Sequence, residues 1–318
     1  MTPRPQHVRP KWRRHVTIVA GFKCYEGIVL CADTQETVAE LSKRHVPKLL
    51  FEPKDQLGNP VYVHGDELAV AFCGAADNGP FVDRLVEEAW DVAKSGTNIE
   101  EVSDLIDGSI QRTYKRYGEI FQRGYCPSAD LIFGVKMQGE SKLFNATGPI
   151  VTEQQKFYSG GAGYYMADFL ASRMYEDSLS LRQCVILAAY VLFQAKEHVD
   201  GCGGESQIAI LRDDGISGMV DSLAIESINT MLGESDSSLG RLLLSSADLE
   251  MTDRQFSDLA EATKTMLERC RHAELPNYRT RKSIGKRVSV SCVTGLGIDG
   301  FGLPMPSTPE KSEGQREN

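Results

Sequence analysis

The chain of 318 residues lacks several features that define common protein classes. No apolar run approaches the ~18 residues that a membrane-spanning helix needs, which argues against a membrane protein. Its eight cysteines form no Cys-x-x-Cys pair, so neither a zinc ribbon nor a disulfide framework is favoured. The six histidines are dispersed without a metal-ligand spacing. We therefore expect no metal and no cofactor.

Charge is distributed unevenly along the chain. The net charge of −9 argues against a nucleic-acid-binding protein, although residues 1–15 form a basic arm with five Lys and Arg side chains. This arm has no apolar core and is not a secretory signal; we expect a flexible, solvated tail, or else a propeptide or docking peptide. Several cysteines lie within apolar strand or helix patterns, as reduced thiols of a cytoplasmic protein would.

Hydrophobic patterns predict strands and helices in alternating groups. Strands are expected at 17–24, 28–34, 61–63, 68–73, 130–137, 141–146, 206–212 and 216–221, and helices at 81–93, 99–121, 164–176 and 180–198. Two groups of strands separated by helix pairs disfavour a doubly wound parallel sheet. The order instead predicts an α+β fold in which helices cover both outer faces of two packed sheets.

The same patterns suggest four parts of the chain. Residues 1–16 form the N-terminal extension and 17–221 the main domain. Residues 222–302 form a C-terminal extension with a helix near 252–272 and a strand-like stretch at 287–293. The Pro-, Ser- and Glu-rich tail at 303–318 is expected to be disordered.

The most informative stretch is 17–33, which reads as two strands joined by a tight turn. Thr17 opens the first strand, Asp33 closes the second, and Lys48 follows fifteen residues later. Together with two further segments, this stretch resembles the proteasome A/B-type subunit family, which includes the 20S beta subunits and HslV-like peptidases. The three segments are 17–34, 71–77 and 200–204, within a resemblance that covers about 17–221.

The resemblance implies a fold and an assembly. The fold would be the four-layer αββα sandwich of N-terminal-nucleophile (Ntn) hydrolases, here with a C-terminal helical extension. The implied activity is threonine-type peptide hydrolysis in intracellular protein degradation. Other copies or related subunits would complete a ring, with the helix faces at 81–121 as the contact surface. The implied substrate is a peptide or unfolded protein, and an ATPase is a further implied partner.

The resemblance also carries over a set of site residues. Thr17 would be the nucleophile, with its own α-amine, of pKa about 7.7–8.0, as the general base. Lys48 would lower the pKa of that amine and hydroxyl, while Asp33 would orient Lys48 and keep it charged. Asp200 would be an orienting acceptor beside the nucleophile. Backbone N–H groups at Cys73-Gly74 would form the oxyanion hole.

Four positions depart from the family pattern. Val16 stands where a glycine precedes the threonine, and a β-branched residue crowds the carbonyl that Thr17 must attack. Ala162 and Gly203 replace serines, and Cys73 replaces a glycine of the oxyanion turn. Until the bond between Val16 and Thr17 is cut, the nitrogen of Thr17 is an amide that cannot accept a proton.

Each site residue also has a structural interpretation. Asp33 and Lys48 would form an ion pair that holds two strands, Asp200 would terminate a helix, and Cys73 would be a packing thiol. Three hypotheses therefore stay open. The chain is a threonine peptidase or ring subunit, a catalytically inactive scaffold of the same fold, or a hydrolase that acts on a non-peptide amide.

Overall fold

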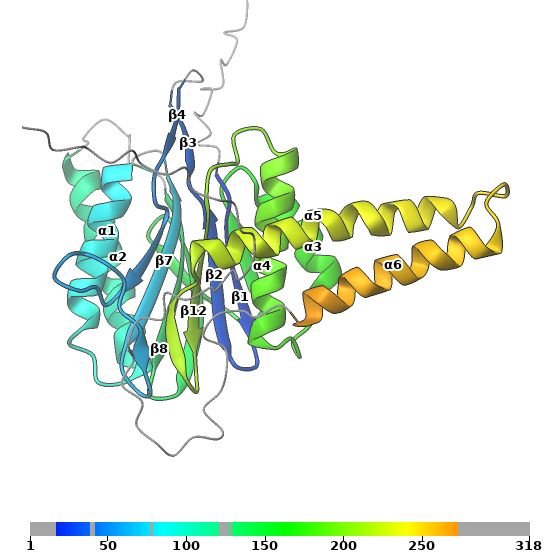
Figure 1. The fold of residues 1–318 in the computed structure, drawn as a ribbon. Helices are drawn as coiled ribbons and strands as arrows, with labels where there is room; N and C mark the ends of the chain where they lie inside the picture. The colour runs from blue at the N-terminus through cyan, green and yellow to red at the C-terminus, as the bar shows by residue number, and fades with distance from the viewer. Residues whose placement is uncertain (1–16, 39–41, 77–78, 121–126, 128, 273–318) are drawn as a thin grey trace, which may run out of the picture. The chain divides into compact units, whose positions relative to one another are not determined.

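The computed structural model describes residues 17–38, 42–76, 79–120, 127 and 129–272 (Figure 1). The N-terminal extension at 1–16, the strand-like stretch at 287–293 and the tail at 303–318 were all predicted from the sequence. These three segments lie outside the described residues.

The strands form two main sheets and a small hairpin. The six-stranded sheet has the order β11-β1-β2-β12-β13-β6, the five-stranded sheet has the order β10-β9-β8-β7-β5, and β3 pairs with β4. Neighbouring strands are antiparallel. The strands are β1 (Val19–Cys24), β2 (Gly27–Asp33), β3 (Gln35–Val38), β4 (Ser42–His45), β5 (Leu49–Glu52), β6 (Val63–His64), β7 (Ala69–Ala76), β8 (Ala129–Met137), β9 (Glu140–Thr147), β10 (Ile150–Gln154), β11 (Phe157–Gly160), β12 (Ser206–Arg212) and β13 (Ile216–Met219).

Six helices accompany these sheets in the described part of the chain. They are α1 (Gly79–Ala93), α2 (Ile99–Ile120), α3 (Tyr164–Met174), α4 (Leu181–His198), α5 (Ser222–Ser245) and α6 (Asp253–His272). The α+β class is confirmed, as are the two predicted helix pairs and the helix near 252–272. Helix α5 and the strands β3, β4, β5, β10 and β11 were not predicted.

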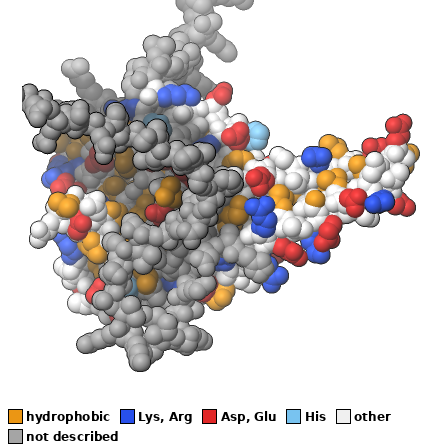
Figure 2. Space-filling model, in the orientation of Figure 1, with side chains coloured by type: hydrophobic (Ala, Val, Ile, Leu, Met, Phe, Trp, Pro, Cys, Tyr) orange, Lys and Arg blue, Asp and Glu red, His pale blue; other side chains and the backbone are white. Residues whose placement is uncertain are grey.

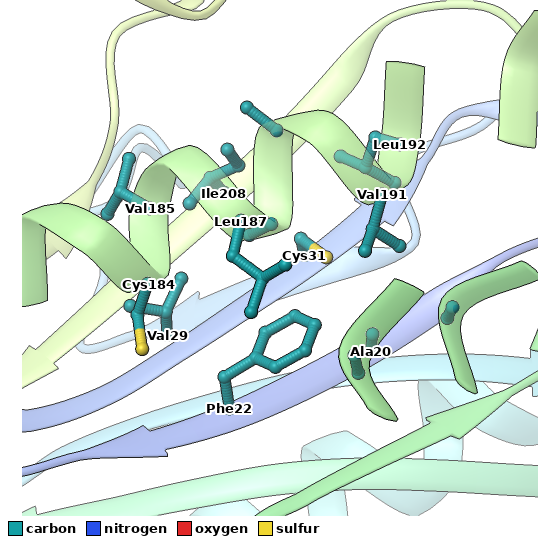
Figure 3. Packing of buried hydrophobic residues seen from close by; sticks show 14 of the residues in the cluster. Ala20, Phe22, Val29, Cys31, Cys184, Val185, Leu187, Val191, Leu192 and Ile208 are labelled. Atoms are coloured by element: carbon teal, nitrogen blue, oxygen red, sulfur yellow. The ribbon is translucent and has the colours of Figure 1, made fainter. Parts of the chain in front are cut away.

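Side chains along β1 and β2 point alternately to the two faces of the six-stranded sheet, so this sheet packs against α4 on one face and against the five-stranded sheet on the other. Ala20 and Phe22 of β1 and Cys31 of β2 point toward α4, where they pack among apolar side chains such as Leu187 and Val191 (Figure 3). The intervening residues, such as Val19 and Leu30, pack against the five-stranded sheet instead. Successive side chains of a strand point to opposite faces, so a strand buried on both faces reads as one apolar run.

Helices α1 and α2 cover the outer face of the five-stranded sheet (Figure 1). Phe81, Ile106 and Ile110 are fully buried there against Phe133. On the other sheet, Ser180 is the N-cap of α4, and its side chain forms a capping box with Gln183. The helix pairs therefore fix the two sheets from outside, while the third apolar cluster lies between the sheets.

Helix α5 packs against the core through its N-terminal half. Ile225 and Ile228 are buried, whereas Leu239, Leu243 and Leu244 are 46%, 72% and 76% exposed. Along α5 and α6, hydrophobic side chains alternate with acidic and basic ones on the surface (Figure 2). In the part of the chain that the structure describes, no helix is both long and apolar enough to cross a bilayer.

Candidate active site

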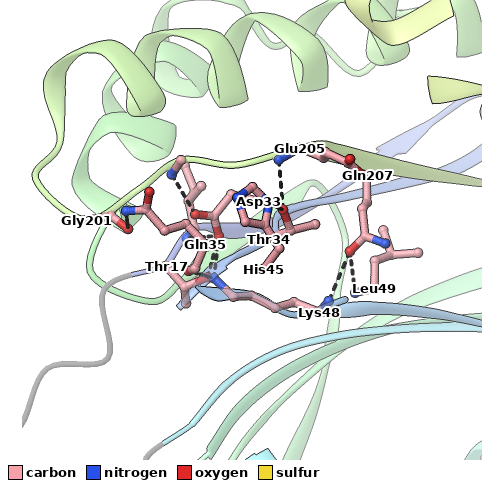
Figure 4. Close-up of polar contacts among 12 residues, drawn as sticks. Thr17, Asp33, Thr34, Gln35, His45, Lys48, Leu49, Gly201, Glu205 and Gln207 are labelled. Carbon is pink, nitrogen blue, oxygen red and sulfur yellow. Dashed lines mark hydrogen bonds and ion pairs between the residues drawn. The ribbon is translucent and has the colours of Figure 1, made fainter. Parts of the chain in front are cut away.

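The predicted trio of Thr17, Asp33 and Lys48 converges at one end of the two sheets (Figure 4). Thr17 directly precedes β1, and Asp33 is the last residue of β2. The register pairs Val19 with Ala32, which brings Thr17 and Asp33 to the same end of this strand pair. Lys48 directly precedes β5 of the other sheet, so the site joins the two sheets.

The hydroxyl of Thr17 has two charged partners. It donates a hydrogen bond to Asp33 Oδ1 over 2.5 Å, and Lys48 Nζ donates a hydrogen bond to the same hydroxyl. Lys48 Nζ also lies 2.7 Å from Asp33 Oδ1. The Thr17 residue is only 3% exposed, so these contacts form away from bulk water. The arrangement fixes the hydroxyl between a carboxylate and an ammonium.

Asp33 is fully buried and has a donor for each carboxylate oxygen. Besides Thr17 and Lys48, Oδ1 accepts a hydrogen bond from the N–H of Ile18 at 3.2 Å. Oδ2 accepts from the N–H of Gly203 at 2.9 Å. A buried carboxylate remains ionised only where donors and an opposite charge replace its hydration, and this site supplies both.

Lys48 is held at its backbone and at its ammonium. The N–H groups of Lys48 and Leu49 donate to Gln207 Oε1 at 3.0 and 3.3 Å, and Nζ donates to the carbonyl of Gln35. Burial lowers the pKa of the Lys48 ammonium, while the Asp33 charge beside it raises that pKa. The balance leaves an ammonium whose pKa is below its ordinary value, next to a hydroxyl.

Glycines make room for the backbone of Thr17. The N–H of Gly163 donates to the Thr17 carbonyl at 3.0 Å. Gly161 has φ +79°, and a Cβ built on it would stand 2.4 Å from the same carbonyl oxygen. A side chain at position 161 would thus be strained and would also collide with Thr17.

The other predicted site residues are placed differently. Asp200 is exposed, and no hydrogen bond joins its carboxylate to another described residue. Cys73 and Gly74 lie within β7, where the N–H of Gly74 donates to the Lys48 carbonyl at 3.2 Å. The Cys73 thiol is 1% exposed among the residues between the sheets, and burial raises its pKa well above the ordinary value. The structure therefore brings together Thr17, Asp33 and Lys48, whereas the roles of Asp200, Cys73 and Gly74 stay predictions.

Two site residues, Gln35 and Gln207, were missed by sequence reasoning. Their contacts with residues near 201 and 48 span more than 150 positions of sequence, so no local pattern marks them. The glycine-rich stretches near 161–163 and 200–204 were considered for their family pattern, but their contacts with Thr17 and Asp33 were not predicted. Among the described residues, no group of three or more His, Cys, Asp or Glu side chains could hold a metal ion.

Comparisons with solved structures find Anbu proteins. An Anbu (Gly-1) mutant from Hyphomicrobium sp. strain MC1 aligns with a TM-score of 0.55 at 15% identity, covering 74% of this chain and 99% of that chain. Anbu, described as an ancestral beta-subunit, from Yersinia bercovieri has a TM-score of 0.55 at 14% identity, covering 71% and 97%. A helical assembly of the Anbu complex from Pseudomonas aeruginosa has a TM-score of 0.55 at 12% identity, covering 72% and 96%. Similarity at this identity shows a shared fold alone.

These findings correct the family assignment made from the sequence. No protein-family model matches the chain, and no curated protein matches it. The solved structures compared above are Anbu proteins, not 20S proteasome A/B-type or HslV-like subunits, so the assignment to that family was wrong. Its three supporting segments are short, and short segments around a few polar residues can be similar in proteins whose remaining sequence differs.

Proposed function

We propose that this chain is a self-assembling subunit of ancestral beta-subunit type that hydrolyses peptide bonds through Thr17, in cytoplasmic protein degradation. The observation that carries the proposal is the Thr17 hydroxyl held between Asp33 and Lys48. The fold shared with Anbu proteins supports it. In this proposal the two sheets and their outer helices form the four-layer αββα Ntn-hydrolase sandwich over 17–221. Residues 222–302 form its C-terminal extension, with α5 and α6 as the helical part.

The proposed chemistry begins when the bond between Val16 and Thr17 is cut. The free α-amine of Thr17 then takes the proton of its own hydroxyl, and Oγ1 attacks the substrate carbonyl carbon. The C–N bond breaks, the leaving amine takes the proton, and an ester to Thr17 remains. Water then attacks the ester, with its proton passing through the α-amine back to Oγ1 as the acid is released.

Lys48 and Asp33 have distinct parts in this scheme. The Lys48 ammonium favours the deprotonated forms of the neighbouring hydroxyl and amine, because a positive charge nearby lowers their pKa values. Asp33 orients Lys48 and balances its charge. For Gly74 to donate to an oxyanion, its N–H would have to exchange the hydrogen bond that it makes with the Lys48 carbonyl.

Assembly is the second part of the proposal. The Pseudomonas aeruginosa Anbu structure is a helical assembly, which supports contacts between copies of this chain, and an ATPase remains a proposed partner. Candidate surfaces are the outer face of α1 and α2 and the exposed leucines of α5. Sedimentation velocity should show a species larger than a monomer, and L243S/L244S should reduce it if α5 is the contact. A monomer at all concentrations would contradict assembly.

A catalytically inactive scaffold is the second candidate function. It is favoured by the uncut chain itself, in which Val16 precedes Thr17, and Thr17 is 3% exposed with its hydroxyl already bonded to Asp33 and Lys48. A site built only for stability would show these contacts as well. The scaffold and the peptidase therefore differ in turnover, not in this geometry.

Hydrolysis of fluorogenic peptides and of small non-peptide amides by the purified particle tests the proposal. We expect peptide turnover by the wild-type protein, loss of turnover in Thr17→Ala and retention of a measurable fraction in Thr17→Ser. Turnover that persists in Thr17→Ala would contradict the role of Thr17. Turnover of small amides alone would favour the non-peptide hydrolase. If a chain that begins at Thr17 shows no turnover of either substrate, the inactive scaffold is favoured instead.

A further inference from the structure

Gln35 connects the site to the loop at 201–204. Its N–H donates to the Gly203 carbonyl at 3.0 Å, and its side-chain Nε2 donates to the Gly201 carbonyl at 2.7 Å. Its own backbone carbonyl accepts a hydrogen bond from Lys48 Nζ. Gln35 is 8% exposed, so these contacts are made in a largely dry environment. One residue thus contacts the lysine on one side and the loop on the other (Figure 4).

Gly203 and the Gln35 side chain fit together. A Cβ built on Gly203 would stand 2.5 Å from Gln35 Oε1 and 3.0 Å from its Cδ. Gly203 is not among the glycines with positive φ, so its backbone does not require glycine. The absence of a side chain at 203 is instead explained by the space that Gln35 occupies. The loop glycine at 203 is therefore matched by a glutamine from strand β3.

The position of this loop determines the surroundings of Asp33. The N–H of Gly203 is the donor to Asp33 Oδ2, at 2.9 Å. If the loop moved away, that oxygen would be buried without this donor, and the ionised carboxylate would become less stable. Without this donor the carboxylate is also no longer held in place, and a carboxylate that turns away from Lys48 Nζ stabilises the ammonium less.

We propose that Gln35 is a positioning residue, which holds Gly203 against Asp33 and thereby keeps the Lys48 ammonium charged and directed at the Thr17 hydroxyl. Burial acts against that charge, so the ammonium depends on its partners. Charged or titratable groups that act on this pair are Asp33 of β2, Glu36 of β3, Cys202 of the loop and Lys196 of α4. Glu36 is engaged by Arg44 at 2.5 Å, whereas Gln35 links the ammonium and the loop directly. The effect of Gln35 on catalysis rests on the proposed function, whereas its effect on the charge of Lys48 does not.

The direct test is a pH titration of Lys48 in the full chain, observed by NMR with isotope-labelled lysine. The Lys48 signal is assigned by its absence in Lys48→Arg. We expect Gln35→Leu to lower the titration midpoint of Lys48 by about one pH unit or more. The matched control Gln111→Leu changes an exposed glutamine on α2 and should leave the midpoint unchanged. A folded Gln35→Leu protein with the wild-type midpoint would overturn the proposal. Because no turnover is measured, this result is independent of whether the chain is a peptidase.

A second experiment uses the fit between positions 35 and 203 and does not need Gln35→Leu to fold. Gly203→Ala should lower the melting temperature, because the Gln35 amide can make room for the new Cβ only by giving up its hydrogen bond to the Gly201 carbonyl. In a Gln35→Ala background, Gly203→Ala should lower the melting temperature by clearly less, because the colliding amide is gone. Equal losses in both backgrounds would show that the two positions are not coupled, and would overturn the proposal.

Discussion

The Thr17 hydroxyl donates to Asp33 Oδ1 across 2.5 Å, so in the uncut chain its proton points at a carboxylate. Lys48 Nζ donates to the same hydroxyl oxygen. A hydroxyl bound in this way is oriented but not deprotonated, because the ammonium has no free lone pair and a carboxylate is too weak a base to take the proton. The α-amine released by cutting the chain would supply a stronger base.

Thr17→Val should destabilise the folded protein by about 1–3 kcal/mol. Valine has nearly the shape of threonine, but it would leave Asp33 Oδ1 and Lys48 Nζ each without one buried partner. Thr17→Ser keeps the hydroxyl and serves as the control, with a smaller loss from its missing methyl group. Urea unfolding of both variants measures the difference, and equal stabilities would mean that the hydroxyl contributes nothing to the fold.

Lys48→Met should lower the free energy of unfolding by about 3–5 kcal/mol, more than Thr17→Val, because it leaves the Asp33 carboxylate buried without a cation. Asp33→Asn combined with Lys48→Met removes both charges and should recover part of this loss. Denaturant unfolding of Asp33→Asn, Lys48→Met and the double variant compares them directly. If the double variant is as unstable as the sum of the single ones, the two side chains do not act as a pair.

Gly161→Ala should show how closely the turn at 161 approaches Thr17. Gly58 has φ +82° with nothing within 4 Å of its Cβ position, so Gly58→Ala reports the backbone strain alone, about 1 kcal/mol. Gly161 has nearly the same φ, but its Cβ would collide with the Thr17 carbonyl. We expect Gly161→Ala to cost about 1–3 kcal/mol more than Gly58→Ala in thermal or urea unfolding. Equal costs would contradict the close approach.

Buried thiols should make the protein lose stability in alkali. Burial raises the pKa of Cys31 to about 12, and burial together with the Asp33 charge raises that of Cys202 to about 12, from an ordinary value of 9.0. Between these values the unfolded chain loses the thiol proton and the folded chain keeps it, so stability falls as pH rises above 9.0. At pH 10 each thiol should contribute a loss of about 1.4 kcal/mol.

The lowered pKa of Lys48 acts in the opposite direction. From its folded pKa up to its ordinary value of 10.5, the unfolded chain binds more protons, so this group alone makes stability rise with pH. The thiols are tested by replacing them. In Cys31→Ala and in Cys202→Ala, the free energy of unfolding, measured with urea under reducing conditions, should fall less steeply between about pH 8 and pH 10 than in the wild-type protein. An unchanged slope in both variants would contradict the assignment to these thiols.

The sequence predicted the elements with strong periodicity and missed those without it. Strands β1 and β2 are continuous apolar runs, and α1, α2 and α4 have clear apolar faces, so each was found. Helix α5 contains Gly233, Gly240 and six serines, which are poor helix formers, and only its N-terminal half packs against the core. Strands such as β11 are four residues long and depend on pairing with β1, which a local pattern does not reveal.

The candidate site was predictable to a similar extent. Thr17, Asp33 and Lys48 lie at the ends of strands, and antiparallel pairing brings such ends together, so their order along the chain was informative. Gln35 and Gln207 act through contacts between segments far apart in sequence, and their neighbours give no signal. Asp200 shows the reverse case, since a residue with a suitable type and spacing is exposed in the structure.

The intact mass of the purified wild-type protein, compared with that of Thr17→Ala, tests the central proposal most directly. We expect the wild-type chain to begin at Thr17 and the variant to retain residues 1–16, because cutting the bond requires the same hydroxyl. A wild-type chain that begins at Met1 or Thr2, with the same N-terminus as the variant and no peptide turnover, would contradict a threonine peptidase.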